Sequence, residues 1–222
     1  MKDLLQIINK EFLLVARSGY GVFMPVAYLL IIMILFNISI SFVDKKITQE
    51  LIPLMIWISC LLICILNLET IFKEDYEDGS LEMFLINKKN IESTIIAKIF
   101  THWVSSNFPV VIIAPMVALL LGLDSHTAMI LFISLLIGTP SLTLIGSIAA
   151  ALTISLRSNK ILLSLMVLPL YIPILIYGTN AVNNSYFGIS YQGEITMMIL
   201  LFILFLLITP FTCAKALLVA LD

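Results

Sequence analysis

Apolar residues gather in six long stretches, and short polar segments between them hold most of the charge. The stretches are 21–43, 51–72, 99–123, 127–156, 161–179 and 195–217. A helix rises about 1.5 Å per residue and the hydrocarbon core of a bilayer is about 30 Å thick, so roughly 20 apolar residues can cross it. The pattern therefore predicts six transmembrane helices.

The first residues follow a different pattern, in which apolar and polar side chains occupy opposite faces of a helix. At 100° per residue Leu4, Ile8 and Phe12 fall on one face, while Lys2 and Asn9 fall opposite. A helix of this kind lies in the membrane interface rather than crossing it. We expect an interfacial amphipathic helix over residues 2–18.

Composition supports a membrane protein with no separate soluble domain. Hydrophobic residues make up 61% of the 222 residues and charged residues only 12%, against about a quarter in soluble proteins. We therefore expect an all-α, polytopic membrane helix bundle that forms a single transmembrane domain over 1–222. The net charge of −2 gives no electrostatic basis for binding nucleic acid.

The distribution of lysine and arginine predicts the orientation in the membrane. With a cytoplasmic N-terminus, ten of the 12 basic residues fall on the inner side and only Lys45 and Lys46 fall outside. Both termini and the 157–160 turn are then cytoplasmic. The outer segments are 44–50, 122–126 and 178–194. The part from Gly178 to Gly193 is polar but uncharged and is compatible with an ordinary loop or a short re-entrant element.

Helix-breaking residues interrupt three of the predicted spans. They are Pro109 and Pro115 in the third stretch, Gly138 and Pro140 in the fourth, and Pro169 and Pro173 in the fifth. We expect the third span to kink, and the fourth, about thirty residues long, to tilt strongly or break near Pro140. These positions are open to two interpretations, helix-packing geometry or hinges used in a transport cycle.

The chain lacks the sequence motifs typical of ATPases and hydrolases. It has no P-loop and no hydrolase motif, and its predicted spans hold no ionisable group in their apolar parts, which disfavours ion-coupled transport. His102 and His126 are the only imidazoles that could ligate haem iron, but the predicted topology places them on opposite sides of the membrane. A polar anchor is the alternative role for each. We expect no enzyme activity and no metal site.

An acidic segment between the second and third spans is the strongest candidate for a contact with a soluble partner. Six of the 14 carboxylates lie within Glu69–Glu82. A helix ending at Gly79 and followed by apolar residues could enter a groove on a cytosolic protein, although a solvated helix face would give the same pattern.

This segment resembles the cytoplasmic signature of the CcmB family, the membrane subunits of the haem exporter of cytochrome c maturation. The resemblance rests on Leu68–Glu82 and on three later stretches in the same order, Ala97–Trp103, Ala114–Leu123 and Gly138–Pro173. Together they cover most of residues 60–180. After Leu85 the chain departs from the proline- and leucine-rich link expected of the family.

The resemblance implies an ABC-2-like exporter subunit in the bacterial cytoplasmic (inner) membrane. It implies two copies of this chain on a pair of CcmA ATPases that bind ATP and Mg²⁺, associated with CcmC and CcmD, and serving the haem chaperone CcmE. Residues 69–97 then form the segment coupled to the ATPase. The coupling residues that it implies are Glu69, Lys73, Glu74, Asp75, Asp78, Gly79, Ser80 and Glu82.

Two mechanisms remain open within this interpretation, because the spans show no evident haem ligand pair. ATP could drive haem export through the complex or release of a haem-loaded chaperone at the outer face. Two other functions are kept as alternatives, an exporter permease for another hydrophobic substrate such as a lipid or drug, and a membrane scaffold that transports nothing.

Overall fold

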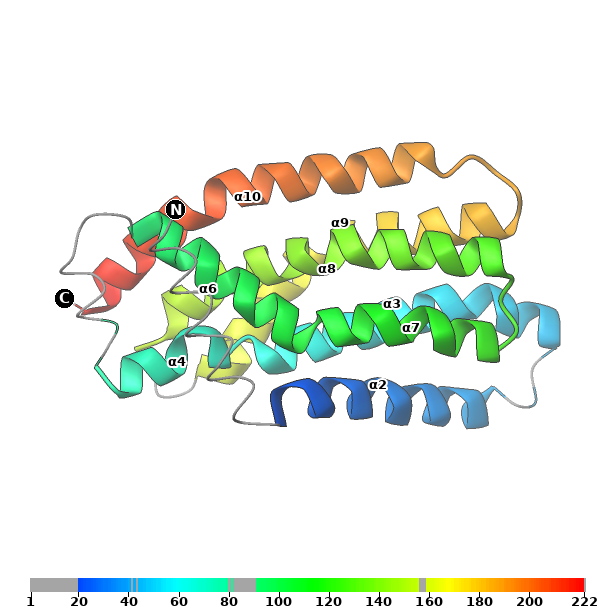
Figure 1. Ribbon diagram of the computed structural model, residues 1–222, viewed down its shortest axis with the longest axis horizontal. Helices are drawn as coiled ribbons and strands as arrows, with labels where there is room; N and C mark the ends of the chain where they lie inside the picture. Colours follow the sequence, from blue (N-terminus) through cyan, green and yellow to red (C-terminus); the bar gives the residue numbers. More distant parts are fainter. Residues whose placement is uncertain are drawn as a thin grey trace.

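The protein is a bundle of long α-helices running along a common axis (Figure 1). The computed structural model describes residues 20–40, 42, 44–79, 81, 91–155 and 159–221. The helices are α2 (Tyr20–Ser39), α3 (Lys45–Asn67), α4 (Thr70–Glu77), α6 (Ile91–Ser106), α7 (Phe108–Leu120), α8 (Ser125–Thr153), α9 (Asn159–Tyr186) and α10 (Gln192–Leu221). The predicted interfacial helix over 2–18 lies outside the described residues.

The predicted polytopic helical bundle is confirmed. Five helical segments are long and apolar enough to cross a membrane, and a shorter apolar segment, Phe23–Ser39, lies in α2. With 20 residues, α2 is about 30 Å long, which matches the hydrocarbon core. The six apolar segments found in the described part of the chain correspond to the six predicted stretches.

The third span is divided into α6 and α7 at Asn107, and Pro109 is the second residue of α7. Proline has no N–H to donate and clashes with the preceding turn, so an interruption is expected just before it. The helix begins earlier than predicted, at Ile91, and therefore includes Lys98.

The break considered for the fourth span does not occur, because α8 continues through Gly138 and Pro140 as one helix of 29 residues. Hydroxyl groups support the backbone around the proline. Thr139 donates to the carbonyl of Leu135 at 2.8 Å, and Ser141 donates to that of Ile137 at 2.8 Å. These carbonyls flank the one that Pro140 leaves without its helical donor.

The outer segment 178–194 is neither a long loop nor a re-entrant element. Helix α9 continues through its first half to Tyr186, and α10 begins at Gln192. Gly188, with φ +70°, ends the helix, as the Gly188 N–H donates to the Ser185 carbonyl at 3.1 Å and the Ile189 N–H to that of Asn184 at 2.7 Å. Polar residues extend the helix here because they find partners on neighbouring helices.

Helix α8 is the centre of the bundle. It packs against α9, α10, α7 and α3. In its most apolar 18-residue stretch 67% of the residues are buried, against 28% in the corresponding stretches of α9 and α10. Small residues make this possible, since Gly138 and Gly146 let side chains from α3 and α9 approach the helix backbone.

The predicted inner and outer segments lie at opposite ends of the bundle. Helix α4, the start of α6 and the end of α10 lie at one end, while the connections from α2 to α3, α7 to α8 and α9 to α10 lie at the other (Figure 1). The charge distribution predicts that the first end faces the cytoplasm. We refer to the two ends as inner and outer on that basis.

Candidate functional site

The acidic segment forms a short helix that continues almost directly from the second predicted span. After α3 ends at Asn67, the chain makes one turn through Leu68 and Glu69 before α4 begins. The Thr70 hydroxyl donates to the Asn67 carbonyl at 2.8 Å and the Ile71 N–H to that of Leu68 at 3.3 Å. Movement of α4 is therefore tied to α3.

The two faces of α4 differ sharply in burial. Ile71 and Phe72 are 1% and 2% exposed and pack into the core, whereas Tyr76 and Glu77 face outward. Asp78 and Gly79 follow the helix and are exposed too. Gly79 has φ +75°, a conformation that glycine adopts without strain, and the chain then returns to the bundle at the buried Leu81.

Asp75 belongs to the inward face of α4, where it forms an ion pair with Lys98 of α6. Both side chains are 14% exposed. A second ion pair of α4 joins Lys73 to Glu77 at 3.9 Å, on the solvent side. Asp75 therefore holds α4 against α6, rather than presenting its carboxylate to solvent.

The remaining predicted coupling residues occupy less defined positions. Glu69 lies half-buried in the turn between α3 and α4, and Glu74 belongs to α4 by its backbone. Ser80 and Glu82 lie outside the described residues. The predicted set does not include Tyr76, Glu77 or Lys98, which lie on α4 or contact it.

The helix-breaking residues Pro109 and Pro140 lie near a cluster of hydrogen-bonded polar side chains inside the bundle. Asn107, two residues before Pro109, donates to the hydroxyl of Thr143 at 3.3 Å, and Trp103 donates to that of Thr139 at 2.9 Å. Thr139 and Thr143 flank Pro140. Polar groups inside a membrane protein commonly join helices or mark a functional site.

Helix α9 contributes to the same cluster through Tyr171, which lies between Pro169 and Pro173. The Tyr171 hydroxyl donates to the Leu142 carbonyl at 2.8 Å and lies 3.7 Å from the sulfur of Cys64. The breakers of three spans thus meet around one set of hydrogen bonds. Pro115 lies apart from them, inside α7.

The two histidines are not brought together. His102 lies on α6 one turn beyond Lys98, and its buried Nε2 has no hydrogen-bond partner within the described ranges. His126 is in the first turn of α8 at the outer end, where its Nδ1 lies 3.1 Å from the Ser185 hydroxyl. No group of three or more metal-ligating side chains occurs in the part of the chain that the structure describes.

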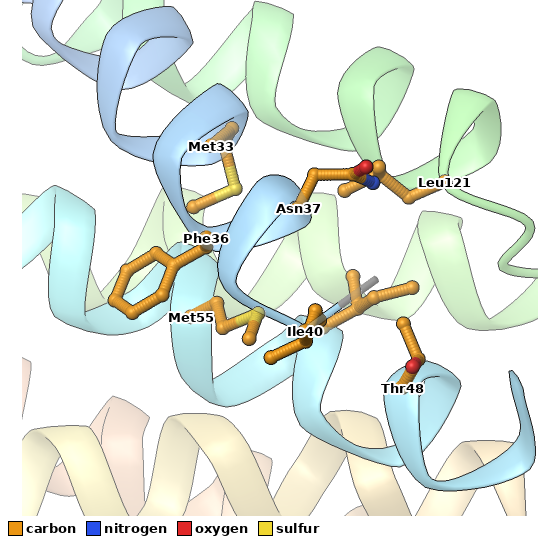
Figure 2. Close-up of a pocket in the computed structure, with 8 residues that line it drawn as sticks. Met33, Phe36, Asn37, Ile40, Thr48, Met55 and Leu121 are labelled. Carbon is orange, nitrogen blue, oxygen red and sulfur yellow. The ribbon is translucent and has the colours of Figure 1, made fainter. Parts of the chain in front are cut away.

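Among the residues that the structure describes, two hollows between the helices are lined mainly by apolar side chains. One, of about 270 Å³, lies between α6, α8 and α10 and is lined by Phe100, Trp103, Pro140 and Phe202 among others. The other, of about 10 Å³, lies near the outer end between α2, α3 and Leu121 (Figure 2). Neither has the convergent polar groups that would fix a polar ligand.

Comparison with known proteins identifies the family. The family model described as "CcmB protein" matches residues 2–220. The chain belongs to the CcmB family. It is 35% identical over 211 residues to "Heme exporter protein B" of Pseudomonas aeruginosa, covering 95% of this chain and 94% of that protein.

Other CcmB proteins match over a similar extent. "Heme exporter protein B" of Haemophilus influenzae is 33% identical over 98% of each chain, and that of Escherichia coli K12 is 32% identical over 96% of each. The alignment includes α4 and both ends of the bundle. This protein is thus a multi-pass membrane protein of a haem exporter family.

Proposed function

We propose that this CcmB protein is the membrane subunit of an ATP-driven exporter complex in cytochrome c maturation. It serves haem export, or release of the haem-loaded chaperone, at the outer face of the bacterial cytoplasmic membrane. The observation that supports this most is the nearly full-length match to relatives named heme exporter protein B. Haem is the handled substrate and not a resident cofactor of this chain.

The energy for this function comes from a partner, since the sequence contains no P-loop. A CcmA-like ATPase binds ATP and Mg²⁺, and CcmC- and CcmD-like subunits complete the membrane part of the complex. The complex acts indirectly on the chaperone CcmE. It contains two copies of this chain. In these terms the chain is a transporter subunit that catalyses no reaction itself.

The exposed residues of α4 and its following turn provide the surface for the ATPase. We call this set, Lys73, Tyr76, Glu77, Asp78 and Gly79, the α4 surface. Its two exposed carboxylates favour a basic groove on the partner, and Tyr76, with 36% of its side chain exposed, offers an aromatic anchor.

Coupling follows from how α4 is attached to the bundle. Ile71 and Phe72 pack in the core, and the Asp75–Lys98 ion pair joins α4 to α6. Helix α6 leads to Asn107, which hydrogen-bonds to α8 beside Pro140. A shift of α4 driven by nucleotide binding would therefore move α6 and, through Asn107, bend α8 near Pro140. In this mechanism the helix-breaking residues act as hinges.

The test is a charge reversal confined to exposed positions, Glu77→Lys with Asp78→Lys. We expect about a tenfold loss of ATPase co-purified in mild detergent, because the reversed charges repel a basic groove. Yield and thermal stability of the membrane subunit should be unchanged. Normal ATPase retention and turnover in this variant would contradict the coupling role of the α4 surface.

Glu92→Lys is the matched control, since Glu92 is an exposed carboxylate at the same end, in the first turn of α6. It should retain the ATPase. A strain lacking the protein should also lose cytochrome c. Normal cytochrome c there would favour an exporter of another hydrophobic substrate, and ATPase activity indifferent to the α4 surface would favour a scaffold.

A further inference from the structure

The side chain of Gln49, near the start of α3, joins three parts of the bundle at its outer end. Its Nε2 donates to the carbonyl of Gly122, in the turn between α7 and α8, at 2.9 Å. Its Oε1 accepts a hydrogen bond from the hydroxyl of Tyr186, at the end of α9, at 3.1 Å. We call Gln49, Gly122 and Tyr186 the outer clasp.

The orientation of the amide is fixed by its partners. A backbone carbonyl can only accept, so the nitrogen of Gln49 must face Gly122, which leaves the oxygen for Tyr186. Few side chains can replace it. An acid would face the Gly122 carbonyl with a second acceptor, and an apolar residue would lose both hydrogen bonds.

Further hydrogen bonds continue the connection from α8 to α10. His126 of α8 lies 3.1 Å from the Ser185 hydroxyl of α9, and Asn184 donates to the carboxylate of Glu194 at 2.8 Å. Asp124 caps α8, and the Thr127 N–H that its carboxylate accepts keeps the pKa of Asp124 below its usual value. The outer ends of α3, α8, α9 and α10 are thus held by directional contacts.

The packing between α2 and α3 beside this end is mainly apolar, with Asn37 and Thr48 as the polar side chains in its lining (Figure 2). Met33 and Phe36 of α2 meet Ile52 and Met55 of α3 and Leu121 around the hollow of about 10 Å³ (Figure 2). Such contacts allow small sliding of one helix past another. At the outer end, the directional contacts of α3 with α9 and with the α7–α8 turn are those of the outer clasp.

We infer that Gln49 is a positioning residue that holds the outer end of the bundle closed, and that its two hydrogen bonds must break for this end to open. The reason for this end to open rests on the proposed ATP-driven cycle. The closed clasp itself does not depend on that proposal. Each lost hydrogen bond should raise the ratio of open to closed protein about fivefold, and loss of both about 25-fold.

The experiment measures the distance between α3 and the α9–α10 connection by double electron–electron resonance. Spin labels are attached to Ile47→Cys and Ile189→Cys, whose native side chains are 49% and 57% exposed, in the full chain in lipid nanodiscs. Without nucleotide, we expect one short distance in the otherwise native protein. In Gln49→Ala a second, longer distance should appear, because a larger fraction of the protein is open than in the native chain.

Tyr186→Phe and Thr196→Ala make the comparison specific. Tyr186→Phe removes one hydrogen bond and keeps the ring, so its longer population should lie between the native protein and Gln49→Ala. Thr196 donates only within its own helix, to the Gln192 carbonyl at 2.7 Å, and Thr196→Ala should leave the distances unchanged. Correct folding is checked by a single, unshifted size-exclusion peak.

The outcomes separate this inference from the proposed function. Unchanged distances in both Gln49→Ala and Tyr186→Phe would overturn the clasp. In the complex with its ATPase, a non-hydrolysable ATP analogue should populate the longer distance in the native chain. Absence of that response, with Gln49→Ala still lengthening the distance, would leave the clasp standing and contradict the ATP-driven cycle.

Discussion

Trp57 is enclosed by two glycines from different helices, and this contact sets the spacing at the middle of the bundle. Its ring is fully buried, and it lies against Gly138 of α8 and Gly178 of α9. A methyl group at either glycine would overlap the indole. Because the ring has no exposed side into which it could retreat, the two positions need glycine for space and not for backbone conformation.

Gly138→Ala should lower the stability of the bundle. Overpacking a filled core costs about 1–3 kcal/mol, which outweighs the up to about 1 kcal/mol that alanine contributes in a helix. Thermal unfolding in detergent, followed by fluorescence-detected size exclusion, measures the change. Trp57→Phe should reduce the loss in the double variant, since it removes the overlapping atoms.

Gly193→Ala provides the control for this prediction. Gly193 is in the first turn of α10, and an added methyl group would meet no atom within 4 Å. Its stability should equal or exceed that of the native protein. A Gly138→Ala variant that behaves in the same way would show that the core around Trp57 yields easily.

At the scale of elements, α4 could be predicted from the sequence in outline but not in orientation. The helix, its end near Gly79 and the return of apolar residues all follow from residue types. Asp75 was grouped with the surface carboxylates, although it stands four residues after Ile71 and three after Phe72, on the same helix face. That spacing was the available signal that Asp75 faces inward.

Lys98 should matter for attachment of α4 in a way that Lys73 does not. Lys98→Met leaves the enclosed Asp75 carboxylate without its ion pair, which should cost about 1–3 kcal/mol. Lys73→Met breaks only an exposed pair with Glu77 and should change stability by under about 0.5 kcal/mol. Thermal unfolding of the two variants gives the comparison, and equal effects would contradict the role assigned to Lys98.

For the whole molecule, the sequence predicted the number and order of the spans, because apolar length is a strong local signal. It could not predict which distant side chains meet. Gln49 and Gly122 are 73 residues apart, and Asn107 and Thr143 are 36 apart. Polar residues of this kind lack a period that identifies a partner, so the outer clasp and the polar cluster appear only in three dimensions.

Sidedness of the whole molecule can be tested by labelling with a membrane-impermeant maleimide. Ile189→Cys should react in intact cells with a permeabilised outer membrane, and Asp78→Cys only after lysis, as expected from the charge distribution. The native thiols Cys60, Cys64 and Cys213 are buried and should contribute little background. The reverse labelling order would invert the assigned inner and outer ends.

The enclosure of Trp57 also bears on how the chain is made. During synthesis α3 emerges long before α8 and α9, so the indole remains without Gly138 and Gly178 until the second half of the protein has entered the membrane. In the N-terminal half alone, the large Trp57 side chain would face lipid. We therefore expect that a chain cut between α7 and α8 assembles only when both fragments are supplied together.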